Sequence, residues 1–113
     1  MGAAHRDLAS GRWHTMTLVE QLANVGSEVN RAIEAQAGGR VRRRDQALKR
    51  ALELFDLTGT DDRWRGHRRR EVLRVREEFG RLFYVDDAPP GSAASLQRYF
   101  LQLGVLARRP PAA

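Results

Sequence analysis

Four segments of the chain repeat apolar side chains at three- and four-residue spacing, and this periodicity constrains the fold more than any other feature. In an α-helix such spacing places the side chains in one stripe that faces a core. The first stripe advances in steps of four, three, four and four, at Leu18, Leu22, Val25, Val29 and Ile33. Breakers rich in glycine, proline or aspartate at 38–39, 58–62 and 86–91 separate the segments. The sequence therefore predicts an all-α fold, an antiparallel up-down-up-down four-helix bundle.

Capping residues place the ends of the first two helices. Thr17 and Glu20 have the spacing of a capping box, so we expect the first helix to begin near residue 15 or 17. The Gly38-Gly39 pair ends that helix, because glycine readily takes the positive φ with which a chain leaves a helix. The second helix is expected over about 40–57.

The stretch 63–85 begins with a basic run and continues into the third expected helix, which Asp61 or Asp62 can cap. Ser92 is the expected N-cap of the fourth helix, which begins after the proline-rich breaker. The sequence then divides into three parts: a flexible N-terminal segment at 1–11, the bundle at 12–109 and a C-terminal tail at 110–113.

The last three helices have apolar faces that we expect to form one core with the first. Those faces are Ala47, Leu48, Ala51, Leu52, Leu54 and Phe55; Val72, Val75, Phe79, Leu82 and Phe83; and Leu96, Tyr99, Phe100, Leu103, Leu106 and Ala107.

A polar stripe lies beside the apolar stripe of the first helix, at Gln21, Asn24, Glu28 and Arg31. We interpret it as a solvated helix face. The alternatives are a buried polar network or a contact between copies of the chain.

Positive charge gathers at one end of the predicted bundle. The chain has a net charge of +6, and Lys49 is its only lysine beside 19 arginines. In the predicted topology nine arginines and five acidic residues fall at one end, which leaves +4 there, whereas the opposite end is balanced. Cations at a helix start oppose the helix dipole, so their repetition there indicates a need for charge.

This end predicts a nucleic-acid site, because arginine contacts phosphate and aromatic rings stack on bases. The alternatives are that arginine reflects genome composition and that each tryptophan closes an end of the core. The predicted site residues are Arg63, Trp64, Arg65, Arg68, Arg69, Arg70, Arg108, Arg109 and Trp13.

The sequence carries no signature of catalysis, metal binding or a cofactor. There are no cysteines, and His5, His14 and His67 match no ligand motif, so we expect no metal. Helical ribonucleases of the HEPN class place a longer gap between arginine and histidine than Arg63 and His67 have, so that role is not carried over. No apolar run is long enough to span a membrane, and we expect a non-enzymatic, cytoplasmic protein.

Three segments carry a resemblance: WHTMTLVEQLANVGSE at 13–28, ALELFDLT at 51–58 and SLQRYF at 95–100. They resemble a group of short, uncharacterised prokaryotic helical proteins, which implies a bundle over roughly residues 12–109 and no catalytic residues. In size, basicity and helix count the chain is also similar to the four-helix accessory proteins of diversity-generating reverse transcriptases. That resemblance implies an oligomer that binds RNA and a polymerase.

These features lead to two functional hypotheses. The first is an accessory or adaptor protein that binds RNA or single-stranded DNA through the basic end. The second is a protein-interaction module or homo-oligomeric scaffold that binds no nucleic acid.

Overall fold

The computed structural model describes residues 11–109, and within that range it contains four α-helices and no β-strand. A short 3-10 turn at Trp13–Thr15 precedes the helices α2 (Leu18–Ala37), α3 (Val41–Gly59), α4 (His67–Tyr84) and α5 (Ser92–Arg108). The all-α class is therefore confirmed. The N-terminal segment expected at 1–11, apart from Gly11, and the tail expected at 110–113 lie outside the described residues.

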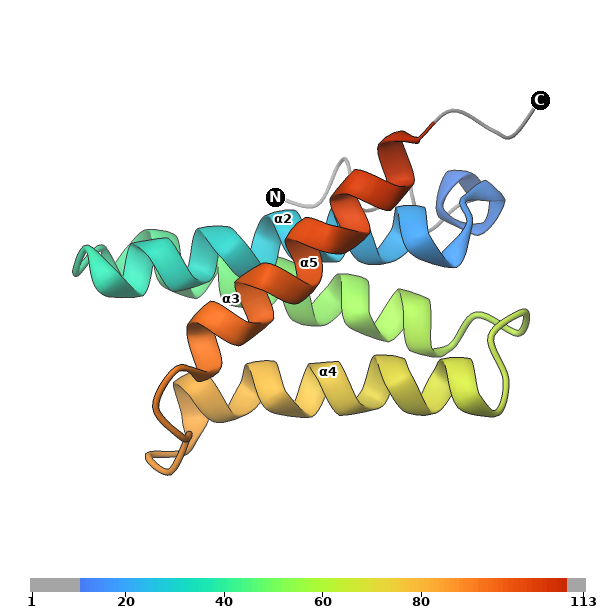
Figure 1. Cartoon of the computed structure of the whole chain (residues 1–113). Helices are drawn as coiled ribbons and strands as arrows, with labels where there is room; N and C mark the ends of the chain where they lie inside the picture. Colours follow the sequence, from blue (N-terminus) through green and yellow to red (C-terminus); the bar gives the residue numbers. More distant parts are fainter. Residues whose placement is uncertain (1–10, 110–113) are drawn as a thin grey trace.

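The four helices share one core (Figure 1). α2 packs mainly against α3 and α5, whereas α4 makes smaller contacts with the same two helices. The ring of Phe55 lies 5.8 Å from that of Phe79 and 6.4 Å from that of Phe100, so aromatic rings of α3, α4 and α5 meet at the centre. The radius of gyration is 14.1 Å, close to the roughly 13 Å of a folded domain of this length. The helices therefore form a compact bundle.

The first helix begins and ends as its sequence predicts. The Thr17 side chain accepts a hydrogen bond from the Glu20 backbone N–H, and the Glu20 side chain accepts one from the Thr17 N–H. This capping box satisfies two N–H groups that the first turn leaves free. At the other end Gly39 has a φ of 71°, which lets the chain turn directly into α3.

The predicted N-cap of the third helix is wrong. α4 begins at His67, and its N-cap is Gly66 with a φ of 64°. Neither Asp61 nor Asp62 caps it, because the Asp61 carboxylate is turned into the protein and bonded elsewhere. The N-cap of α5 is likewise Gly91 rather than Ser92, whose hydroxyl instead donates to the Pro89 carbonyl.

The interpretation of the polar stripe on α2 as solvated is wrong for two of its four members. Gln21 and Glu28 are buried, whereas Asn24 and Arg31 are exposed. Glu28 pairs with Arg31, and Gln21 belongs to a network with the segment between α3 and α4. The alternative of a buried polar network therefore holds at Gln21.

α5 crosses the other helices obliquely, as Figure 1 shows. A Cβ atom placed on Gly26 would lie 2.7 Å from Phe100, so this glycine lets α5 approach α2 closely. The last turns of α5 leave the core. Leu106 was expected to face inward, but it is 48% exposed.

Among the described residues, no helix combines the length and the apolar character needed to cross a membrane.

Candidate nucleic-acid interface

The segment between α3 and α4 is organised around the buried carboxylate of Asp61. One oxygen, Oδ1, accepts hydrogen bonds from the backbone N–H and the Nε of Arg63, at 3.0 and 3.1 Å. The other, Oδ2, accepts from Arg63 Nη2 at 2.8 Å and from Gln21 Nε2 at 3.1 Å. His14 Nδ1 lies 3.2 Å from the same oxygen. Every lone pair of this buried carboxylate is therefore used.

Hydrogen bonding also fixes the charge state of Asp61. Its bonds with Arg63 have the largest effect and, with those to Gln21 and His14, they hold the pKa of the carboxyl far below its ordinary value. Burial acts in the opposite direction but is outweighed. Asp61 is therefore an anion throughout the physiological range, and its charge is matched inside the protein.

Gln21 joins this carboxylate to both tryptophans. Its Nε2 donates to the Trp13 carbonyl at 2.9 Å as well as to Asp61, and its Oε1 accepts from Trp64 Nε1 at 2.7 Å. Gln21 is fully buried, so these bonds replace the water that its amide would otherwise hold. The start of α2 and the 61–64 turn are thus tied together.

The two tryptophans have different surroundings. Trp13 is fully buried and belongs to the core, so its ring offers no face to a base, contrary to the expectation of stacking. Trp64 is half-buried, and the guanidinium groups of Arg63 and Arg68 lie 4.4 and 5.9 Å from its ring centre. Arg63 is held there by Asp61, whereas Arg68 has no ion pair among the described residues. Arg68 is therefore the cation that a base stacking on Trp64 would displace.

The predicted arginines fall into two groups of different character. Arg63 and Arg69 stabilise the turn between α3 and α4, since Arg63 binds the Asp61 carboxylate and Arg69 donates to the Asp61 carbonyl at 3.3 Å. Arg65, Arg68 and Arg70 are exposed, and none of them pairs with a carboxylate in the described part of the chain, although Arg65 Nε donates to the Asp62 carbonyl at 3.1 Å. We call these three residues and His67, which is also exposed, the α4 basic cluster.

The α4 basic cluster surrounds a helix start that lacks a cap. The Gly66 N-cap has no side chain to accept a hydrogen bond, and the first turn of α4 contains no acidic residue. The first backbone N–H groups of a helix carry partial positive charge and point outward. Cations and free N–H donors therefore face solvent together, an arrangement that favours an anion.

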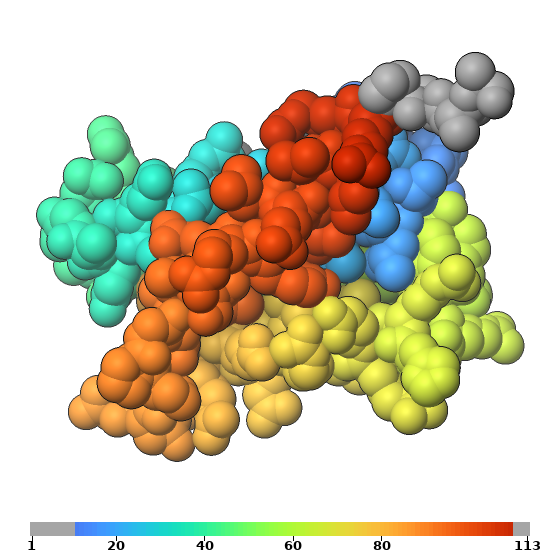
Figure 2. Space-filling view, in the orientation of Figure 1, coloured from blue at the N-terminus to red at the C-terminus, as the bar shows by residue number. Residues whose placement is uncertain are grey.

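The other two predicted arginines, Arg108 and Arg109, belong to a different helix. They lie at the C-terminal end of α5, and Arg108 lines a groove beside Ala23 and Asn24 of α2. On the face seen in Figure 2, the start of α2 lies between the end of α5 and the segment that leads into α4.

Sequence reasoning missed Asp61, Gln21 and His14 as the residues that shape this surface. The available signals were an aspartate two positions before Arg63, typical of a side-chain-to-backbone turn, and a polar residue next to the apolar stripe of α2. Among the described residues, no group of histidine and carboxylate side chains is arranged to hold a metal ion.

Fold and surface together define a class: a small all-helical bundle with an arginine-rich segment held against the start of its first helix. Comparison of the chain with protein-family models, with curated proteins and with solved structures found no match.

Proposed function

We propose that this chain is a non-enzymatic adaptor, acting in the cytoplasm, that binds RNA or single-stranded DNA through the α4 basic cluster. The proposal takes the bundle to be antiparallel, up-down-up-down, so that α2 and α4 start at the same end. The observation that carries it is the set of exposed cations around the uncapped start of α4, which form no ion pair within residues 11–109.

Energetics support a phosphate ligand at this position. Each cation in the first turn of a helix opposes the dipole by a few tenths of a kcal/mol, and three arginines there also repel one another. A phosphate group reverses both effects, because it accepts from backbone N–H groups and pairs with guanidinium. Arg65, Arg68 and Arg70 would contact successive phosphates of a flexible strand.

Trp64 supports a preference for unpaired bases. It is the one tryptophan with exposed surface among the described residues, and Arg68 beside it is free to move onto a phosphate. Stacking on an aromatic ring needs a base whose face is open, which duplexes do not present. Single strands should therefore bind more tightly than duplex DNA.

The test is a fluorescence-anisotropy titration of labelled single-stranded RNA, single-stranded DNA and duplex DNA at two salt concentrations. For three phosphate contacts on a single strand, affinity should fall roughly twentyfold between about 50 mM and about 200 mM salt. A variant with Arg65, Arg68 and Arg70 replaced by Gln should lose at least tenfold in affinity at low salt and most of the salt dependence.

A matched control removes the same charge elsewhere. Arg42, Arg43 and Arg50 are exposed on α3, and their replacement by Gln should cost much less affinity than the α4 variant. Equal losses in the two variants would show that overall charge, rather than the α4 basic cluster, binds the strand. No binding of any strand at low salt would contradict the nucleic-acid proposal and favour the protein-interaction hypothesis.

A further inference from the structure

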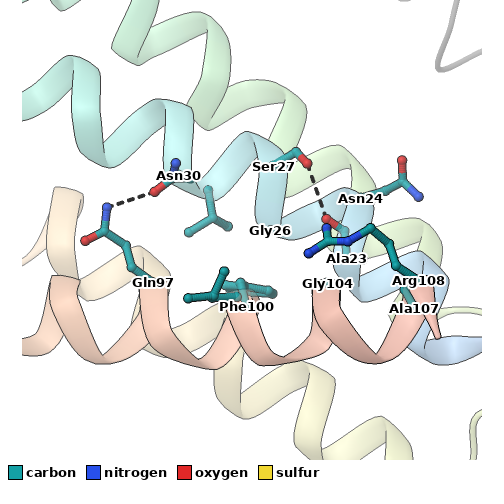
Figure 3. A pocket seen from close by; sticks show the side chains of 12 residues that line it. Ala23, Asn24, Gly26, Ser27, Asn30, Gln97, Phe100, Gly104, Ala107 and Arg108 are labelled. Carbon is teal, nitrogen blue, oxygen red and sulfur yellow. Dashed lines mark hydrogen bonds between the residues drawn. The ribbon is translucent and has the colours of Figure 1, made fainter.

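The outer face formed by α2 and α5 contains an open groove of about 500 Å³, and none of the four residues of the α4 basic cluster lines it. Figure 3 shows its floor near Gly26 and Gly104, with Asn30 and Gln97 joined by a hydrogen bond at one end and Arg108 at the other. Small side chains leave this groove unfilled within the chain. Beside it, α5 exposes apolar side chains that no described residue covers, Leu101 at 64% and Val105 at 46%.

The exposed stripe of α5 is apolar in the middle and basic at both ends. Arg98, Leu101, Val105 and Arg108 follow at steps of three, four and three, which places them on one side of the helix. From residue 88 to 109 the chain contains three arginines and no acidic residue. Neither Arg98 nor Arg108 forms an ion pair within residues 11–109.

The adjoining stripe of α2 has the opposite pattern. Glu20, Ala23, Ser27, Asn30 and Glu34 follow at steps of three, four, three and four, with acidic residues at both ends and small or neutral residues between. Glu20 and Glu34 are exposed, and their carboxylates accept hydrogen bonds only from Thr17 and Asn30 in the described region. Both negative charges therefore lack a cationic partner there.

The two stripes also match in length. Arg98 and Arg108 are ten residues apart, or about 15 Å along the helix, and Glu20 and Glu34 are fourteen apart, or about 21 Å. The difference of about 3 Å at each end is within the reach of an arginine side chain. Within one chain members of both stripes line the same groove, but their charged ends form no ion pair with one another among residues 11–109.

We propose that this α2/α5 face binds a second copy of the chain, so that α5 of each copy lies against α2 of the other. In a two-fold arrangement one contact is repeated by symmetry, so both pairs of stripes are satisfied at once. Leu101 and Val105 of one copy cover Ala23 and Ser27 of its partner, and the arginines pair with the acidic ends. This dimer leaves the α4 basic cluster exposed and does not depend on nucleic-acid binding.

Sedimentation velocity of the full chain without nucleic acid tests the apolar contact. The wild-type protein should show a monomer–dimer equilibrium, and Leu101→Glu or Val105→Glu should each raise the dimer Kd at least tenfold. The control is Leu73→Glu, since Leu73 is 51% exposed on α4 and should leave the dimer unchanged. Circular dichroism verifies that all three variants, substituted at exposed sites, keep their helices.

A charge exchange tests the assignment of the pairs. One variant carries Arg98→Glu and Arg108→Glu; the other carries Glu20→Gln, which preserves the capping box, and Glu34→Arg. Each variant alone brings like charges together and should be monomeric, whereas an equimolar mixture should form a heterodimer. A wild-type chain that stays monomeric at high micromolar concentration would overturn the proposal. The proposal would also be overturned if Leu101→Glu and each charge variant alone still formed the dimer.

Discussion

At the scale of single residues, Asp61 is the side chain on which the shape of the basic surface depends. Its buried carboxylate accepts from Arg63, Gln21 and His14, three residues that are distant from one another in sequence or belong to different elements. Replacement by Asn keeps the size but removes the charge and reverses the polarity of one side-chain atom. The side-chain NH2 group would then face N–H groups of Arg63 or Gln21, and neither group could accept a hydrogen bond from the other.

We expect Asp61→Asn to lower the free energy of unfolding by about 1 to 2 kcal/mol at pH 7, because hydrogen bonds to a charged group are lost. The folded pKa of Asp61 lies below the unfolded value near 4, so its contribution is present above that pH and is lost as the pH falls further. The difference between wild type and variant should therefore shrink as the pH falls below about 4. Urea unfolding followed by circular dichroism at several pH values measures it.

The control for this experiment is Asp62→Asn. Asp62 is exposed, and its backbone carbonyl rather than its side chain accepts from Arg65. Its replacement should change stability by less than about 0.5 kcal/mol at any pH. If Asp62→Asn had the same effect as Asp61→Asn, the charge of the whole turn would matter rather than the buried network.

The sequence predicts residues whose role is local and misses those whose role depends on distant contacts. Thr17 and Glu20 cap α2 across three positions, and such a bond can be inferred from spacing. Gln21 instead meets Trp64, 43 positions away, so only the packing of α2 against the turn shows that its amide is buried.

At the scale of elements, the close crossing of α2 and α5 depends on Gly26. An added methyl group there would lie 2.7 Å from Phe100, a buried ring that also contacts Phe55. We expect Gly26→Ala to destabilise the protein by about 1 to 3 kcal/mol through overpacking. This loss should exceed the nearly 1 kcal/mol that alanine contributes through helix propensity.

Gly80→Ala should change the stability of the protein in the opposite direction. Gly80 lies within α4, and a Cβ atom there would meet only Tyr84, at 4.0 Å. Helix propensity should then stabilise the protein by about 0.5 to 1 kcal/mol. Thermal unfolding of both variants measures the two effects, and an increase in Tm for Gly26→Ala would contradict the close contact.

The periodicity of the sequence predicts that α5 is a helix with Leu96 and Phe100 in the core, and both are buried. It does not predict the angle at which α5 crosses α2, since that angle depends on how Phe100 fits beside Gly26. Leu106, which the periodicity placed on the inward face, is 48% exposed.

At the scale of the whole molecule, the chain carries a net charge of +6, and the α4 basic cluster contributes three of its cations. Arg65, Arg68 and Arg70 lie within six positions, and the nearby Asp61 is already neutralised by Arg63. Repulsion among exposed charges weakens as salt screens it over about 10 Å at 0.1 M. The Tm should therefore rise from low to moderate salt in the absence of a ligand.

Differential scanning calorimetry at several sodium chloride concentrations tests this expectation. The variant with Arg65, Arg68 and Arg70 replaced by Gln should be more stable at low salt than wild type and should depend less on salt. The α3 variant at Arg42, Arg43 and Arg50 serves as the control and should keep most of the dependence. A Tm that falls with salt would show that attraction, rather than repulsion, dominates the exposed charges.

The hydrogen bond from Trp64 to Gln21 makes detachment of the arginine-bearing segment from α2 measurable separately from unfolding of the whole bundle. The indole N–H of Trp64 donates to Oε1 of the fully buried Gln21, with 2.7 Å between nitrogen and oxygen. It can exchange with deuterium only when the segment detaches from α2. The exchange rate of that one proton therefore reports how often the basic segment opens, while the backbone amides of the buried part of α2 report unfolding of the bundle.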